Sequence, residues 1–189
     1  MGYGVMAYSV SGEAIRSLDG SGNDKIRRAI SGRFRRDIMR FNDNFDLSNE
    51  RGADNMFEAI RHLIMGTDRP LPGYLYGYAY KFIVDFHGRF LDNGLFCPCN
   101  AITIEETIDP QMAALGLPMT LSDLIYQDAL MSFPSPSDFP AYGFWSESTI
   151  KRAHPVFQGA SALSEEMDAI RGWVAQAHSK GDVIVGFYH

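Results

Sequence analysis

Long apolar runs are missing from this sequence. No stretch approaches the roughly 18 apolar residues that a membrane-spanning helix needs, so we expect no membrane segment. The first ten residues, MGYGVMAYSV, lack the basic start and the long apolar stretch of a signal peptide. Met6 stands where a myristoylation signal has Ser or Thr. These absences predict a cytoplasmic protein.

Cysteine is scarce as well. Cys97 and Cys99 flank Pro98, which places them too close together for an unstrained disulfide. They also lack the two-residue spacer of a thioredoxin-like pair. A zinc site would need two further ligands, and no second Cys pair or His pair stands at ligand spacing along the chain. We therefore expect reduced structural thiols and no metal.

Sequence motifs of catalysis are absent too. Gly2 and Gly4 precede or begin an expected strand, whereas the glycines of a dinucleotide-binding loop follow one. The sequence has no Gly-x-Ser-x-Gly elbow and no His-Glu-x-x-His. We therefore expect no catalytic residues and no cofactor, and we lean toward a function that is not enzymatic.

The composition is that of a globular protein. The 189 residues are 46% hydrophobic and 21% charged, which fits one domain over 1–189 with a sizeable core. The net charge is 17 − 23 = −6, which disfavours nucleic acid as a partner for the whole surface. The oligomeric state is left open by the sequence.

The segment YLYGYAYKFIVDFHGRFL, residues 74–91, organises the chain. On a helical wheel, aromatic and aliphatic side chains cover most of its circumference and leave a narrow polar strip with Lys81 and Asp85. A helix that is apolar on most sides needs other elements to cover it. The pattern predicts a central buried helix over about 74–91, including Phe90.

The two ends of the chain predict strands. Residues 3–10 and 182–189 are apolar on both faces, so we expect interior strands that pair in one small sheet. Residues 101–107 suit an edge strand, and residues 121–131 suit a helix that Thr120 and Asp123 cap. Residues 46–54 are polar and loop-like. These patterns predict an α+β, helix-rich single domain.

Arginine is concentrated in one region. Residues 32–45 predict an amphipathic helix with Phe34, Ile38, Phe41 and Phe45 on its inner face. Seven basic residues lie within 25–40. They form either a patch for phosphate or an acidic partner, or a solvated face whose arginines pair with carboxylates, and we favour the second interpretation.

Residues 133–145, FPSPSDFPAYGFW, combine three prolines with large aromatic side chains. Proline excludes a regular helix or an interior strand there. Such a loop either covers the core or exposes a rim of aromatic side chains that could bind a partner. The rim would consist of Phe139, Tyr142, Phe144 and Trp145.

Several of these residues are candidates for a binding site. His87 falls on the same side of the central helix as Tyr80, where a buried imidazole needs hydrogen-bond partners. Lys81 and Asp85, one turn apart, could bind a polar ligand, although a plain salt bridge is the simpler interpretation. The candidate binding residues are Tyr80, Lys81, Asp85, His87, Tyr142 and Trp145.

The segments GYAYKFIVDFHGRFL, DFPAYGFW and KGDVIVGFYH together resemble a family of bacterial proteins of unknown function. More distantly, the chain is similar to small α+β bacterial proteins with a helical body and strands near both ends. The resemblance covers most of the chain and implies the same layout. It implies no catalytic residues.

Two functions fit these features. The first is a cytoplasmic protein-interaction module, for instance an immunity protein that neutralises a toxin, because acidic surfaces often mask the basic active sites of nucleases. The second is a small-ligand-binding protein or enzyme with a pocket near Tyr80, His87 and Trp145.

Overall fold

The computed structural model describes residues 3–45 and 55–189, so the loop expected at 46–54 lies outside the described residues. The chain divides into two compact units. Unit 1 comprises the described residues up to Gly12, Gly88–Ala129 and Ala141–His189, and unit 2 comprises Glu13–His87 and Leu130–Pro140. Within the described ranges, no helix is both long and apolar enough to cross a membrane. The fold class is α+β, as predicted.

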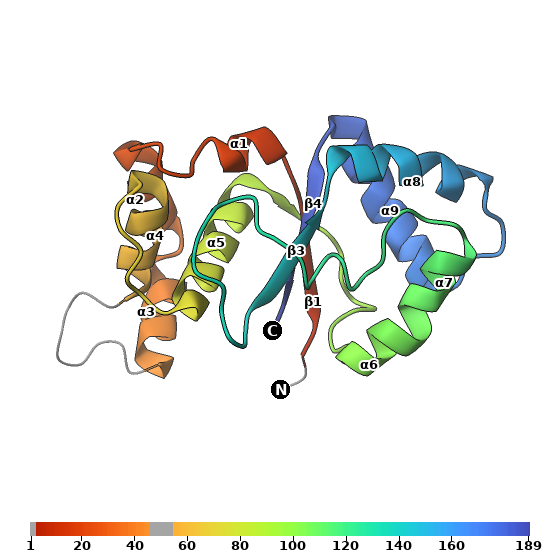
Figure 1. Cartoon of the computed structure of the whole chain (residues 1–189), viewed down its shortest axis with the longest axis horizontal. Helices are drawn as coiled ribbons and strands as arrows, with labels where there is room; N and C mark the ends of the chain where they lie inside the picture. Colours follow the sequence, from red (N-terminus) through yellow and green to blue (C-terminus); the bar gives the residue numbers. More distant parts are fainter. Residues whose placement is uncertain (1–2, 46–54) are drawn as a thin grey trace. The chain divides into compact units, whose positions relative to one another are not determined.

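Unit 1 contains an antiparallel sheet with the strand order β2-β1-β4-β3 (Figure 1). The two chain ends form its centre, because β1 (Val5–Val10) pairs along its whole length with β4 (Val183–Tyr188). The pairing of the two ends confirms the prediction, and every residue of β4 is buried. The edges are the short β2 (Arg89–Phe90) and β3 (Ala141–Trp145).

Helices complete unit 1. They are α6 (Ala101–Thr103), the π-helical turn η1 (Ile104–Ile108), α7 (Asp109–Ala114), α8 (Glu147–Gly159) and α9 (Glu165–Lys180). The edge strand predicted at 101–107 was therefore wrong. Asn100 accepts the backbone N–H of Thr103 at 2.7 Å, which caps α6, and Ile104 and Ile108 are both buried. Their spacing of four residues is helical, and it outweighed the weak alternation in the sequence.

The helix predicted at 121–131 does not form, although its cap does. Thr120 and Asp123 exchange backbone-to-side-chain hydrogen bonds of 2.8 and 3.0 Å, as a capping box requires. The chain makes one turn, and then the backbone N–H of Gln127 donates to the carbonyl of Tyr142 instead of continuing a helix. A bond to β3 thus replaced the local helical bond.

Unit 2 is helical. It holds α2 (Asp24–Arg33), α3 (Arg35–Asn44), α4 (Met56–Met65), α5 (Gly73–His87) and nearly all of α1 (Gly12–Arg16). The single helix expected at 32–45 is interrupted at Phe34, which joins α2 to α3.

Helix α5 is the buried element that the sequence predicted. Its side chains Leu75, Tyr76, Tyr80 and Ile83 are fully buried, and the ring of Phe82 lies 5.2 Å from that of Phe34. The helix ends at His87, earlier than expected, and the chain then enters β2. Phe90 is 44% exposed, so its predicted place on the buried face was wrong.

Candidate docking surface

The candidate residues on α5 differ in their burial and in their hydrogen-bond partners. Tyr80 is fully buried, and its hydroxyl accepts a hydrogen bond of 3.2 Å from the backbone N–H of Leu130. Burial lowers the pKa of the Lys81 ammonium, against the attraction of Asp85 and Asp37. Burial also lowers the pKa of His87, whose Nε2 atom is buried and has no hydrogen-bond partner among the described residues. These groups belong to unit 2.

The candidates on β3 belong to unit 1 and do not form an exposed rim. Tyr142 is 8% exposed, Trp145 is 1% exposed and Phe144 is half-buried. Phe139, which precedes β3 and belongs to unit 2, is also half-buried. The indole N–H of Trp145 donates to the carbonyl oxygen of Thr120 at 2.9 Å. The interpretation of these residues as an exposed aromatic rim is therefore wrong, and the burial of Tyr142 and Trp145 agrees with the favoured interpretation, a loop that covers the core. The ligand pocket near Tyr80, His87 and Trp145 stays a prediction.

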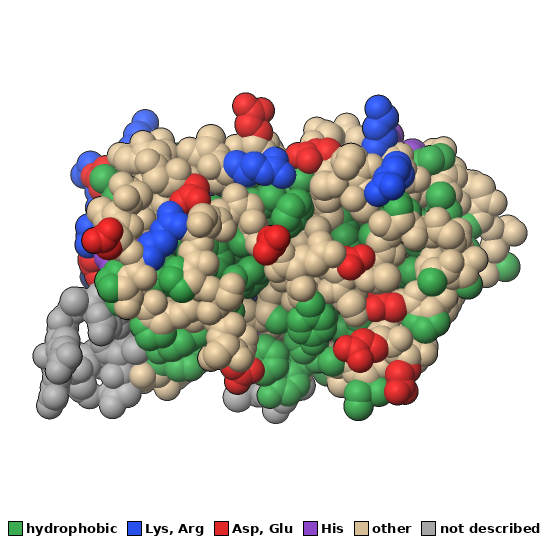
Figure 2. Space-filling model, viewed as in Figure 1, with side chains coloured by type: hydrophobic (Ala, Val, Ile, Leu, Met, Phe, Trp, Pro, Cys, Tyr) green, Lys and Arg blue, Asp and Glu red, His purple; other side chains and the backbone are tan. Residues whose placement is uncertain are grey.

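A different surface of unit 1 combines apolar side chains with uncompensated negative charge. Residues 90–129 contain no Lys, Arg or His and six acidic residues. This segment carries η1 and α7 and belongs wholly to unit 1. Figure 2 shows acidic side chains over α6 and α7. A search for motifs missed this region, and a local count of charge along the chain would have found it.

Leu95 stands between two hollows of unit 1. The first hollow, of about 320 Å³, is lined by Leu95, Asp92 and Trp173 together with Gly94 and Ala169. The indole N–H of Trp173 donates to the carbonyl oxygen of Asp92 at 2.8 Å, which ties two lining residues of this hollow together. Leu95 itself is 45% exposed. An exposed leucine between two depressions is a shape that apolar side chains of a partner can fit.

The second hollow, of about 420 Å³, shares Leu95 with the first. Its lining combines apolar, polar and acidic side chains: Tyr3, Leu95, Pro98, Cys99, Asn100, Thr103, Ile108 and Glu166. Burial, and then the nearby Glu166 carboxylate, raise the pKa of the Cys99 thiol. A thiol with a raised pKa is a poor nucleophile, so Cys99 fills space here.

The loop that carries both hollows is tied to the first strand. The carbonyl of Phe96 accepts the backbone N–H of Val5, and the carbonyl of Tyr3 accepts that of Cys99, both at 2.8 Å. The side-chain amide of Asn93 donates to the carbonyl of Val5, also at 2.8 Å. Two backbone hydrogen bonds and one side-chain hydrogen bond therefore tie this loop to Val5 of β1 and to Tyr3 just before it, which restrains the shape of the hollows before any partner binds.

Exposed tyrosines continue this surface. The ring of Tyr188 lies 5.9 Å from that of Tyr3 and 6.4 Å from that of Tyr126. Tyr3 and Tyr126 are 51% and 50% exposed, and Ile102 is 64% exposed. Burial, with the nearby Glu105 carboxylate, raises the pKa of the Tyr126 hydroxyl. We call this region the Leu95 surface: Tyr3, Leu95, Ile102 and Tyr126 with the acidic Asp92, Glu105 and Glu166.

The acidic groups of the Leu95 surface are not neutralised within the chain. In the described part of the structure, none of Asp92, Glu105 and Glu166 makes an ion pair with Lys, Arg or His. Elsewhere in unit 1, Asp168 pairs with Arg171. The Leu95 surface therefore keeps a negative potential, which attracts cationic groups.

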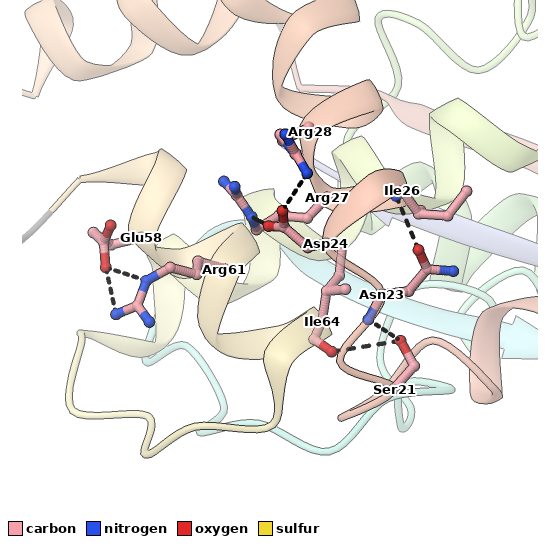
Figure 3. Close-up of polar contacts among 9 residues, drawn as sticks. All are labelled: Ser21, Asn23, Asp24, Ile26, Arg27, Arg28, Glu58, Arg61 and Ile64. Atoms are coloured by element: carbon pink, nitrogen blue, oxygen red, sulfur yellow. Dashed lines mark hydrogen bonds and ion pairs between the residues drawn. The ribbon is translucent and has the colours of Figure 1, made fainter.

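The arginine-rich region of unit 2 is only partly neutralised. Asp24 binds Arg27 at 2.7 Å and Arg28 at 2.8 Å, and Glu58 binds Arg61 at 2.7 Å (Figure 3). Of the basic residues in 25–40, the ion pairs involve only Arg27 and Arg28, and their partner Asp24 belongs to the same helix. The interpretation that these arginines pair with carboxylates elsewhere on the molecule is therefore not borne out within the described residues. Arg35, Arg36 and Arg40 are exposed and make no ion pair with any residue in the described ranges.

Comparison with known proteins finds a match to one protein family. A family described as "Domain of unknown function (DUF7691)" matches residues 1–189. No curated protein and no solved structure matches the chain.

Proposed function

The chain belongs to the DUF7691 family, whose model spans all of it, and we propose that it is a protein-interaction module whose partner presents a basic surface. The observation that carries the proposal is the Leu95 surface, where exposed apolar side chains and two hollows adjoin carboxylates that make no ion pair with any Lys, Arg or His in the described ranges. Protein interfaces are rich in aromatic side chains at such places. Opposite charge on the partner would supply orientation and a fast association rate.

The chemistry of the hollows narrows the partner further. Each hollow has an apolar wall and one carboxylate: Trp173 with Asp92 in the first, and Ile108 with Glu166 in the second. Arginine and lysine have aliphatic stems and charged ends, so they fit a depression of this kind. Arginine also stacks on aromatic rings, which the exposed Tyr3 and Tyr126 provide. A basic segment with arginines would therefore bind across Leu95.

A toxin-neutralising role is the specific form of this proposal. Nucleases bind a polyanion and therefore carry basic active sites. A protein with a preformed acidic and apolar surface can cover such a site and exclude the nucleic acid. The absence of recognisable catalytic motifs in the sequence agrees with a role in which the chain binds and blocks.

Site-specific photo-crosslinking in the source cells tests the proposal. A crosslinker at position 95 should capture one protein with a basic surface, and a crosslinker at Ser179 on α9 is the control position. The captured protein is then purified, and its affinity for the chain is measured by calorimetry. Glu105→Lys with Glu166→Lys should weaken binding by about tenfold or more, because it places cations opposite cations.

The control for charge is Glu13→Lys with Asp43→Lys in unit 2, which changes the net charge equally but leaves the Leu95 surface intact. This variant should bind as the wild type does at physiological salt. The proposal is wrong if the captured partner is acidic, if position 179 captures it equally well, or if both double variants lose the same affinity.

A further inference from the structure

Two histidines from different helices of unit 1 lie ring against ring. The imidazoles of His154 on α8 and His178 on α9 have centroids 4.0 Å apart and planes only 5° from parallel. They are 24 residues apart in the sequence, so no spacing along the chain reveals them. Histidine is the commonest side chain among metal ligands, and its neutral nitrogen is the donor.

The backbone holds both histidines in place. His154 follows the buried Ala153 on α8, and His178 follows the buried Ala177 on α9. Helix α9 is capped just beyond, where Gly181 donates to the carbonyl of His178 at 3.2 Å and Asp182 donates to that of Ala177 at 3.0 Å. The Cα positions of the two histidines are therefore fixed by helix packing and capping, while the exposed ring of His178 can rotate.

We propose that His154 and His178 form a binding site for a divalent transition-metal ion of the zinc, copper and nickel group. Such ions prefer imidazole nitrogen and bind it at about 2.0–2.1 Å. The nitrogen lone pairs lie in the ring planes, which are parallel here, so the exposed ring of His178 must rotate out of the stack before both imidazoles can bind one ion. The last turn of α9 also favours a cation there, because the helix dipole is negative at its C-terminal end.

Neighbouring groups define the limits of this site. Gln158 lies one turn after His154, and its amide nitrogen is 3.5 Å from His154 Nε2. Rotation of this amide would turn its oxygen, which can bind a metal ion, toward the site. Within the described residues, no cluster of three or more His, Cys, Asp or Glu side chains is placed to hold a metal. The ion would therefore keep open positions for water. Lys151, Arg152 and Lys180 lie nearby in the sequence and oppose a cation.

Copper and zinc binding to the purified, tag-free full chain tests this proposal. With one equivalent of Cu²⁺, electron paramagnetic resonance should show coupling to two ring nitrogens. Calorimetry with Zn²⁺ should give one site. His154→Asn and His178→Asn should each lower the affinity about tenfold or more, because each leaves a single imidazole without chelation. Ser179→Ala, next to His178, is the matched control and should bind as the wild type does.

A second readout excludes loss of folding as the cause. Zn²⁺ should raise the thermal midpoint of the wild type and of Ser179→Ala, since an ion that binds only the folded state stabilises it. It should not raise the midpoint of either histidine variant, whose circular dichroism without metal should match the wild type. Unchanged affinity in either histidine variant would overturn the proposal, as would copper coupling to a single nitrogen.

Discussion

Gly143 of β3 and Gly186 of β4 are direct partners across the sheet, and both face the turn that contains Leu124. A Cβ atom at Gly143 would lie 2.4 Å from the carbonyl oxygen of Asp123. A Cβ atom at Gly186 would lie 2.5 Å from that of Leu124. The turn at 121–125 can pack on the sheet because both positions lack a side chain.

The first prediction concerns this glycine pair. Gly143→Ala and Gly186→Ala should each lower the free energy of unfolding by about 1–3 kcal/mol, because the backbone of the turn must move away. Urea denaturation followed by tryptophan fluorescence measures this, since Trp145 and Trp173 both belong to unit 1.

The matched control for the glycine pair is Gly172→Ala on α9, where nothing apart from its chain neighbours and the backbone of its own helix lies within 4 Å of the added Cβ. It should raise stability by about 0.5–1 kcal/mol, because glycine is unfavourable inside a helix. Equal destabilisation by all three alanines would contradict the packing account.

The second prediction is a loss of stability in acid that depends on His62. Burial, with the nearby Arg61 guanidinium, lowers the pKa of His62 against the attraction of Glu58. The unfolded chain, where histidine has a pKa of about 6.5, then binds the proton more tightly than the folded chain. The contribution of His62 to stability should be complete well above pH 6.5 and should be lost as the pH falls through 6.5 toward the lower pKa of the folded state.

Urea midpoints between pH 5 and pH 8, followed by circular dichroism, measure this dependence. His62→Gln should reduce the slope below pH 6.5. His87, whose pKa burial also lowers, should account for part of the remaining slope. A slope unchanged in a variant that combines His62→Gln with His87→Gln would show that other groups cause the acid sensitivity.

The third prediction concerns the hydroxyl of Tyr76. It accepts the backbone N–H of Leu71 at 3.2 Å and lies 3.0 Å from His62 Nδ1, and Arg61 lies 3.2 Å from Nε2 of the same ring. A ring protonated on Nδ1 satisfies both contacts of His62. Tyr76→Phe should cost about 1–3 kcal/mol, because it leaves buried donors unpaired. Tyr126→Phe, at an exposed position, should cost little; equal losses would contradict this prediction.

The fourth prediction concerns Asp19, which joins separate parts of unit 2. Its carboxylate binds the guanidinium of Arg69 and accepts the backbone N–H of Ser132 at 2.8 Å. Asp19→Ala should lower stability by about 1–3 kcal/mol, since both partners lose a charged acceptor. Asp24→Ala, which removes exposed ion pairs within α2, should cost less. Thermal melts followed by circular dichroism measure the stability of both variants. An equal or larger loss in Asp24→Ala would contradict this prediction.

The elements that the sequence predicted well have strong local patterns. Helix α5 follows from a wheel that is apolar on most sides, and the terminal strands follow from runs that are apolar on both faces. The wrong predictions concern segments in which two local patterns compete, or in which a hydrogen bond to a residue far away in the sequence determines the backbone conformation. Residues 101–107 alternate weakly, and the cap at Asn100 decided for a helix.

The candidate site shows the same division. The run 90–129 without a basic residue is visible in the sequence, and it supplies an excess of negative charge. Only the tertiary structure shows that no Lys, Arg or His among the described residues makes an ion pair with Asp92, Glu105 or Glu166. The positions of Tyr3, Tyr126 and Tyr188 beside one another come from strand pairing and a turn, which no local pattern contains.

The sequence by itself therefore determined the buried helix, the two interior strands and the excess of negative charge, because each depends on residues close together in the chain. The tertiary structure alone decided the hollows beside Leu95, the facing glycines of β3 and β4 and the contact between His154 and His178. Each of these joins residues that are remote in sequence, so its geometry depends on how strands pair and helices pack.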